Sequence, residues 1–205
     1  MMKKQNAVSL LLAALFVIAA VAIAGSGRIV GNDVPAPPAI GATIEDFTLP
    51  DTDSKDRTLN SIKGSKGTVL IFISVQCPVS NAYNERMEKL AEDYKAKGIN
   101  VIGVNANNTE PVDAVKAHAS EKHLTFPILK DPGNKLADRL GAQFTPESYV
   151  LDANNKLVYH GRIDNSRDAS QVNSSELREA LDALLAGKPV AKTTSKAFGC
   201  TIKRA

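Results

Sequence analysis

The sequence feature that most constrains the fold is an apolar run that ends in a cysteine and a proline. Residues 68–75 read Thr-Val-Leu-Ile-Phe-Ile-Ser-Val, and Gln76, Cys77 and Pro78 follow. The run is rich in β-branched residues and too short to span a membrane, which predicts a strand buried on both faces. Residues 79–97 carry apolar side chains at helical spacing, so we expect a helix directly after this strand. Cys77 therefore lies where a central strand meets a helix.

This junction favours a reactive thiol. Pro78 suits the first position of a helix, because an N–H group there would have no partner. A thiol at a helix N-terminus faces unpaired N–H groups and the positive end of the helix dipole, and both favour the thiolate. The thiolate is the nucleophilic form, so we expect Cys77 to be a nucleophile whose pKa lies below the free value of about 8.5.

The N-terminal residues predict an exported protein. Lys3 and Lys4 precede an uncharged apolar run, residues 7–24, and no acidic residue occurs before Asp33. A charged start, an apolar run and small residues at its end are typical of a secretory signal cleaved after Ala24. The run is also as long as the shortest membrane-spanning helices, about 17 residues, so an uncleaved anchor is the alternative. In either case the folded part would face an oxidising periplasmic or extracytoplasmic compartment.

Charge and length exclude some classes of protein. The chain carries a formal charge of +3, which falls to +1 without residues 1–24, since these contain two lysines and no acid. A near-neutral body gives no electrostatic basis for binding nucleic acid. The length fits one domain with a sizeable core. The only cysteines, Cys77 and Cys200, are too few and too far apart for a disulfide framework.

The remaining pattern predicts one α/β domain, residues 41–187, between a linker at 25–40 and a tail at 188–205. We expect extended segments at 47–50, 99–104, 126–129, 148–151 and 157–163, and helices at 110–122, 134–140 and 174–186. Parallel crossovers come first and an antiparallel hairpin comes last. This order predicts a mixed central sheet with helices on both faces.

Four segments carry a family resemblance: residues 40–49, 72–78, 144–152 and 157–164. Together they resemble the thioredoxin-like superfamily, in the branch of AhpC/TSA or redoxin domains. The resemblance covers residues 40–187 and implies a thioredoxin-like fold with a thiol-based active site.

The resemblance also implies roles for single residues. Cys77 matches the nucleophile, and Pro146 matches the cis-proline that packs beside it. Ser80 stands where a C-x-x-C motif has its second cysteine, so dithiol chemistry within the motif is absent. Ser74 and Thr145 are candidates to hydrogen-bond the Cys77 thiolate.

The peroxiredoxin pattern fits less well. Leu70 stands where peroxiredoxins have a proline, and Pro146 stands where they have an arginine, whereas Ser74 keeps the expected hydroxyl. Peroxide reduction needs donors that stabilise the departing oxygen. We therefore expect thiol–disulfide exchange to be faster than peroxide reduction, with a peroxiredoxin-type antioxidant as the alternative.

Cys200 is the candidate resolving cysteine. The tail after Gly187 is long enough to reach across the domain, because about 13 extended residues span roughly 40 Å. A reversible Cys77–Cys200 disulfide, a permanent structural staple and two unpaired thiols are the alternatives.

Other polar residues have two interpretations each. Asn81, one turn after the cysteine, could orient a substrate or belong to a polar helix face. The asparagines that follow the second strand could bind a ligand or form a turn: Asn105, Asn107 and Asn108. The histidines have no metal-ligand spacing with a cysteine, so we expect neither a metal nor a cofactor: His118, His123 and His160.

The sequence thus predicts an exported thiol oxidoreductase with Cys77 as nucleophile and Cys200 as possible resolving cysteine. Its expected partners are a thiol or disulfide substrate protein, or a peroxide, and an external thiol reductant. Membrane contact is expected only if the N-terminal segment is not cleaved. The rival from another class is a non-catalytic binding module whose two cysteines form a structural disulfide.

Overall fold

A computed structural model describes residues 34–204 of the protein. The expected signal or anchor at 1–24 lies outside the described residues. The described part forms one compact unit that begins at Val34. Within that part, no helix combines the length and the apolar character needed to cross a bilayer.

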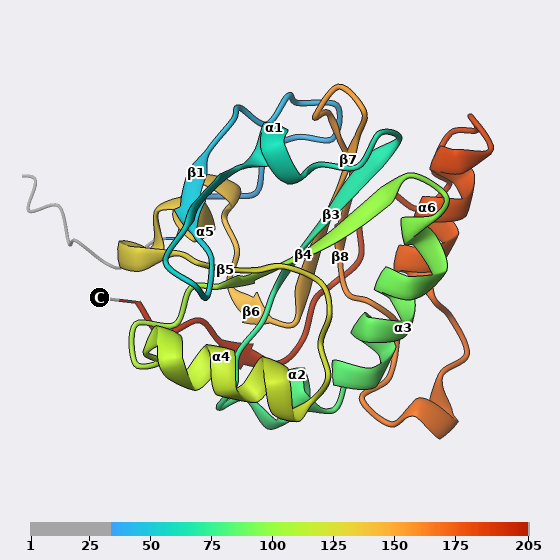
Figure 1. Ribbon diagram of the computed structural model, residues 1–205. Coiled ribbons are helices and arrows are strands. Elements are labelled where there is room, and N and C mark those ends of the chain that lie inside the picture. The colour runs from blue at the N-terminus through green and yellow to red at the C-terminus, as the bar shows by residue number, and fades with distance from the viewer. Residues whose placement is uncertain (1–33, 205) are drawn as a thin grey trace, which may run out of the picture. The chain divides into compact units, whose positions relative to one another are not determined.

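The centre of this unit is a five-stranded mixed sheet with the strand order β5-β4-β3-β7-β8 (Figure 1). Three strands are parallel: β3 (Gly67–Phe72), β4 (Ile99–Asn105) and β5 (Ile128–Lys130). Two more form the terminal hairpin: β7 (Glu147–Asp152) pairs antiparallel with β3, and β8 (Leu157–Gly161) pairs antiparallel with β7. The mixed sheet expected from the order of the elements is confirmed.

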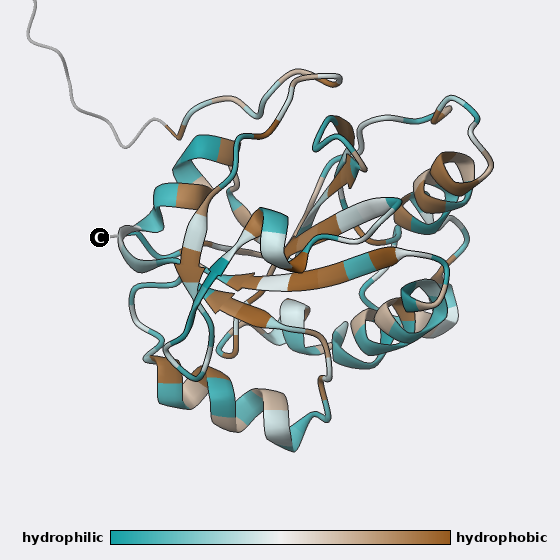
Figure 2. Ribbon diagram, turned by 45° about the horizontal axis from the view of Figure 1, so that its top comes forward, coloured by the Kyte–Doolittle hydropathy of each residue, from teal (hydrophilic) through white to brown (hydrophobic). Residues whose placement is uncertain are grey.

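Helices cover both faces of the sheet, as expected. They are α1 (Leu59–Ile62), α2 (Pro78–Asn81), α3 (Asn84–Lys95), α4 (Val112–Glu121), α5 (Lys135–Leu140) and α6 (Glu176–Leu185), with short 3-10 turns at Pro132–Asn134 and Ala169–Gln171. Hydrophobic residues fill the central strands, and the helices are hydrophobic on one side only (Figure 2).

Alternate residues of β3 supply the two halves of the core. Val69 and Ile71 pack in the cluster that contains the apolar faces of α3 and α6. Leu70 and Phe72 point to the opposite face and pack with residues of α1 and α5. All four side chains are fully buried, which explains why this strand has no polar alternation.

The helix expected at 79–97 is two helices, so that part of the prediction is wrong. α2 is followed by Ala82 and Tyr83, and α3 then begins at Asn84. The N–H of Tyr83 bonds to the carbonyl of Ser80, three residues back, instead of four. This tighter turn ends the α-helical ladder and lets the Tyr83 ring enter the core, where it is 1% exposed.

Two short pairs of strands lie outside the central sheet. The strand expected at 47–50 is β1 (Thr48–Pro50), and it pairs with β2 (Asp56–Thr58) in a separate two-stranded sheet. In the other pair, β6 (Phe144–Thr145) is antiparallel to β9 (Cys200–Thr201), so the tail returns to the middle of the domain. The dark red tail lies between β6 and α2 (Figure 1).

Candidate active site

Cys77 lies just beyond the carboxyl end of β3 and is the N-cap of α2, with Pro78 as the first helical residue. Its side chain is almost fully buried, at 2% exposure. Cys77 Sγ accepts the Ser80 N–H at 3.3 Å and, as a thiol, donates to the Thr145 carbonyl oxygen at 3.2 Å. The expected junction of strand and helix therefore holds the sulfur between α2 and β6.

Ser74 supports the backbone of Cys77 and does not bond its sulfur, so its expected hydrogen bond to the thiolate is wrong. Ser74 Oγ accepts the Cys77 N–H at 3.0 Å and donates its own hydrogen to Glu110 at 2.6 Å. The reason is that a hydroxyl has a single hydrogen, and the carboxylate takes it. Ser80 Oγ in turn accepts the Ser74 N–H at 3.1 Å. Ser80, which stands where a C-x-x-C motif has its second cysteine, therefore supports the loop and has no redox role.

Glu110 organises the whole loop before Cys77, and sequence reasoning assigned it only to a helix. Its fully buried carboxylate accepts hydrogen bonds from the Ser74 hydroxyl, the Val75 and Gln76 N–H groups and the side-chain amides of Asn105 and Asn107. Burial raises the pKa of Glu110, but these donors outweigh it and hold the pKa below its usual range. The carboxylate is therefore charged and fixes residues 74–76. The available signal was an acid between a strand end and a proline.

The loop that faces Cys77 contains a cis peptide bond between Thr145 and Pro146, as the resemblance implies. Thr145 lies directly opposite Cys200 in the register of β6 and β9. Two residues after Cys200, Ile202 donates its N–H to the Gln143 carbonyl at 2.9 Å. Since Cys77 Sγ contacts Thr145, this pairing brings the two cysteines together.

The two cysteines are free thiols with opposite pKa shifts. Burial raises the pKa of Cys77, but hydrogen bonds from the Cys200 and Thr145 side chains and from the Ser80 and Cys200 N–H groups outweigh it, so the net shift is downward. Burial raises the pKa of Cys200, and the hydrogen bond with Cys77 and its negative charge raise it further. Cys77 is thus the more acidic thiol of the pair, and Cys200 is the less acidic one.

The tail reaches this position by a close approach of backbones. Gly199 has a φ of +148°, and a Cβ there would lie 2.1 Å from the Thr145 carbonyl oxygen. The preceding Phe198 ring packs edge-on against Tyr83, with ring centroids 6.4 Å apart. Beyond Cys200, the N–H of Lys203 donates to Asn107 Oδ1 at 2.7 Å. Only glycine fits at position 199 without displacing the tail.

The other polar candidates have structural partners. Asn81 Nδ2 donates to the Val75 carbonyl at 3.0 Å, and its Oδ1 is buried with no hydrogen-bond partner among the described residues. His118 Nε2 pairs with Asn84, and His160 Nε2 pairs with Glu147. Across residues 34–204, His, Cys, Asp and Glu side chains form no group of three or more that could hold a metal ion.

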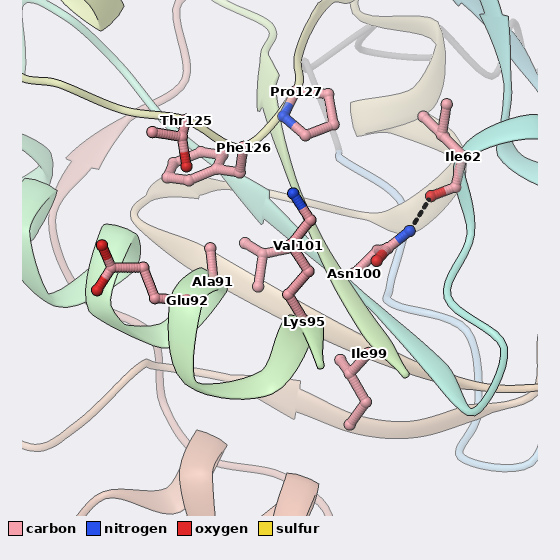
Figure 3. A pocket seen from close by; sticks show the side chains of 10 residues that line it. All are labelled: Ile62, Ala91, Glu92, Lys95, Ile99, Asn100, Val101, Thr125, Phe126 and Pro127. Carbon is pink, nitrogen blue, oxygen red and sulfur yellow. Dashed lines mark hydrogen bonds between the residues drawn. The ribbon is translucent and has the colours of Figure 1, made fainter. Parts of the chain in front are cut away.

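A cavity of about 410 Å³ lies at the other end of the sheet (Figure 3). Its walls come from α3, the start of β4 and the segment before β5, and Asn100 Nδ2 donates to the Ile62 carbonyl at 2.9 Å. Ile99 and Val101 line it and pair with Gly67 and Val69 at the amino end of β3. Cys77 follows the carboxyl end of that strand, so the cavity is separate from the cysteine site.

A mixed sheet with this topology, a cysteine after its central strand and a cis-proline loop beside that cysteine define a thioredoxin-like fold. More narrowly, the chain belongs to the AhpC/TSA family, whose sequence model matches residues 40–160.

Known proteins similar to the chain include enzymes of two kinds. The thiol-disulfide oxidoreductase ResA of Halalkalibacterium halodurans is 31% identical over 118 residues, which is 58% of this chain and 65% of ResA, just under two thirds. The chloroplastic peroxiredoxin Q of Sedum lineare is 29% identical over 141 residues, covering 64% of this chain and 74% of that protein. The crystal structure of the hypothetical protein SMc02350 from Sinorhizobium meliloti 1021 superposes with a TM-score of 0.76 at 34% identity, covering 82% of this chain and 96% of that one.

Proposed function

We propose that the chain is a thiol–disulfide oxidoreductase in which Cys77 is the nucleophile and Cys200 resolves the intermediate. The observation that carries this proposal is the β6–β9 register, which sets Cys200 opposite Thr145, whose carbonyl oxygen is 3.2 Å from Cys77 Sγ. The lowered pKa of Cys77 and the raised pKa of Cys200 suit these two roles. A nucleophile needs thiolate character, and a resolving thiol must reach the nucleophile's sulfur. The names of the ResA relatives support the same activity.

The proposed reaction has two exchange steps. The Cys77 thiolate attacks one sulfur of a substrate disulfide, the other sulfur leaves as a thiolate, and Cys77 is joined to the substrate by a mixed disulfide. Cys200 then loses its proton and attacks Cys77 Sγ, which releases the second substrate thiolate and leaves a Cys77–Cys200 disulfide. Two electrons pass to the substrate, and an external dithiol returns the protein to its reduced form. The same steps in reverse oxidise a dithiol.

Peroxide is the second candidate substrate, and the likeness to peroxiredoxin Q favours it. In that reaction the Cys77 thiolate attacks one oxygen of the peroxide, the other oxygen leaves as hydroxide or alkoxide, and Cys77 becomes a sulfenic acid. The Cys200 thiol then attacks the sulfur of this sulfenic acid, which forms the Cys77–Cys200 disulfide and releases water. Among the described residues, Cys77 Sγ bonds the Ser80 N–H and the Thr145 carbonyl, and Cys200 contributes to its lowered pKa. None of them is cationic, which supports disulfide exchange as the faster reaction.

We also propose that the domain is exported. The support is the charged start at Lys3 and Lys4 followed by the apolar run at 7–24. Expression of the full chain with a C-terminal tag, followed by fractionation and N-terminal sequencing, tests this. Recovery of the protein in the cytoplasm with its N-terminus intact would contradict export.

Parallel rate measurements test the activity. Reduced protein is mixed with hydrogen peroxide or with a small disulfide, and Cys77 oxidation is followed by quenched mass spectrometry. We expect the disulfide to react faster, and Cys200→Ser to accumulate Cys77 as a mixed disulfide. Full turnover of Cys200→Ser would exclude Cys200 as the resolving thiol. A peroxide rate far above that of a free thiolate would favour the peroxiredoxin function.

The reduction potential separates these functions from a structural staple. Structural disulfides in secreted proteins have potentials below about −300 mV, and catalytic ones lie higher. A Cys77–Cys200 potential below that value would support the rival binding module, in which the two cysteines only hold the tail.

A further inference from the structure

Glu147 is a buried carboxylate at the centre of the contacts that hold the tail. It follows the cis-proline, and its side chain is 4% exposed. Its Oε2 accepts the N–H groups of Gln143 and Phe144, each at 2.8 Å. Its Oε1 pairs with His160 Nε2 at 2.6 Å and lies 3.1 Å from the Tyr149 hydroxyl, whose one hydrogen it shares with the Leu140 carbonyl at 3.0 Å. One carboxylate thus ties β6 to both strands of the terminal hairpin.

Gln143 and Phe144 are the residues that receive the end of the tail. The Gln143 carbonyl accepts the Ile202 N–H at 2.9 Å, and Phe144 lies opposite Thr201 in the β6–β9 register. Glu147 accepts the N–H of the Gln143–Phe144 peptide group, whose carbonyl accepts from Ile202, and the N–H of the peptide group before it. The position of β6, and with it the position of Cys200 opposite Thr145, therefore depends on this carboxylate.

His160 holds an earlier part of the tail. Its N–H donates to the Thr193 carbonyl at 3.0 Å, and its carbonyl accepts the Ser195 N–H at 3.0 Å. Its ring stacks on Tyr149, with centroids 4.5 Å apart, which directs Nε2 towards Glu147. Residues 193–195 are thus attached to β8, and residues 200–202 are attached to β6 and Gln143. The Glu147–His160 pair joins these two places of attachment.

The charge of Glu147 suits this task. Burial raises the pKa of Glu147, but the hydrogen bonds from His160, Gln143 and Phe144 outweigh it and lower the pKa below its usual range. An ionised carboxylate only accepts hydrogen bonds, so His160 Nε2 is the donor, and all four partners converge on the two oxygens.

We propose that Glu147, joined to His160, is a positioning residue that sets where Cys200 lies against Cys77. The inference rests on the proposed function, in which Cys200 resolves the intermediate on Cys77. A purely structural role predicts a loss of stability only. A positioning role predicts, in addition, a weaker tendency of Cys200 to pair with Cys77 in the folded protein.

The test compares disulfide pairing in matched variants of the full chain. The equilibrium between the Cys77–Cys200 disulfide and a glutathione buffer is measured by mass spectrometry, and the free energy of unfolding by denaturant titration. Glu147→Gln should lower the pairing constant at least tenfold, equivalent to about 30 mV. Asp51→Asn is the control, since Asp51 also accepts two backbone N–H groups and pairs with a cation, Arg57, far from the tail contacts. It should lower stability and leave pairing within twofold of wild type.

Two histidine variants keep the test decisive if Glu147→Gln does not fold. His160→Ala should weaken pairing in the same direction, and His160→Gln, which keeps an N–H donor near Nε2, should restore it to within threefold of wild type. In a Cys200→Ser background, Glu147→Gln should change the alkylation rate of Cys77 less than threefold. Ser74 and Ser80 hold Cys77 from its own loop, and only its contact with the Thr145 carbonyl depends on β6.

The outcomes separate the two proposals. Unchanged pairing in Glu147→Gln, or a loss no larger than that of Asp51→Asn, would overturn the inference alone. A fall in Cys77 alkylation as large as the fall in pairing would also overturn it, because Glu147 would then act on the nucleophile. Absence of a Cys77–Cys200 disulfide in the wild-type protein would overturn the proposed function together with the inference.

Discussion

Thr145 and Cys200 lie opposite each other in the antiparallel pair of β6 and β9, although 55 residues separate them in the chain. The Thr145 carbonyl oxygen is 3.2 Å from Cys77 Sγ, so this one register position brings the tail thiol to the nucleophile. The second thiol of the site therefore comes from the C-terminus, while Ser80 occupies its place in the motif.

The pKa of Cys77 should depend on Cys200. Cys77 has a lowered pKa because hydrogen bonds, led by the one from the Cys200 side chain, outweigh burial. Cys200→Ala removes that donor, so we expect the pKa of Cys77 to rise and its alkylation at neutral pH to slow. The measurement is the alkylation rate of the Cys77 peptide across pH. Lys203→Ala, which alters the tail without removing a donor to Cys77, is the control, and an equal pKa in wild type and Cys200→Ala would contradict the prediction.

Gly199→Ala should displace Cys200 while the domain stays folded. The added Cβ would lie 2.1 Å from the Thr145 carbonyl oxygen. Such overpacking destabilises the packed position of the tail by about 1–3 kcal/mol. Because Cys200 then spends less time beside Cys77, we expect the disulfide between them to form roughly tenfold more slowly or more. Gly187→Ala is the control, because Gly187 also has a positive φ but no atom lies within 4 Å of the added Cβ. Equal rates of disulfide formation in both variants would refute the argument.

Glu110→Gln should disturb the loop before Cys77. An amide replaces one acceptor oxygen by a donor that faces the N–H groups of Val75, Gln76 or the two asparagines. Leaving buried donors unpaired costs about 1–3 kcal/mol each, so we expect the free energy of unfolding to fall by at least that amount. The exposed Glu121→Gln should change it by less than about 0.5 kcal/mol. Denaturant titration compares the two, and similar values would show that Glu110 does not hold the loop.

The stability of the fold should depend on pH through Glu176. Burial raises the pKa of Glu176, but its bonds with Arg162 and Lys192 outweigh it and hold the pKa at about 2. Because this folded value lies below the unfolded value of about 4.3, the stabilisation is present above pH 4.3 and is lost as the pH falls towards 2. We expect Glu176→Gln to cost about 3 kcal/mol at neutral pH. The difference from wild type should shrink below pH 4, and a difference that stays constant with pH would contradict this assignment.

The sequence by itself determined the parts of the protein that local patterns encode. The β-branched run before Cys77 predicted a buried strand, and Pro78 marked the first residue of a helix. The alternation of elements predicted the mixed sheet, and the segment around Pro146 predicted the cis bond through its resemblance to redoxin domains. The strand and the helix start depend on neighbours within a few residues, which is why they can be read along the chain. The cis bond was implied by the resemblance alone, since an X–Pro bond is cis in only about 5–6% of folded cases.

Local pattern was misleading where a distant partner decides the conformation. The helical spacing of apolar residues continues through Ala82 and Tyr83, but the helix breaks there because the Tyr83 ring turns inward and its hydroxyl reaches Asp164 at 2.8 Å. Ser74 was expected at the thiolate because it precedes Cys77 by three residues. Its hydrogen instead goes to Glu110, 36 residues further along.

Only the tertiary structure decided the composition of the cysteine site. The sequence left open whether Cys200 reaches Cys77, since a tail of that length can lie in many directions. The fold brings them together through β6, through the close approach of Gly199 to Thr145, and through the attachments of the tail at His160 and Asn107. Each of these contacts joins residues far apart in sequence, and no spacing along a chain records which backbone groups will pair once the core has formed.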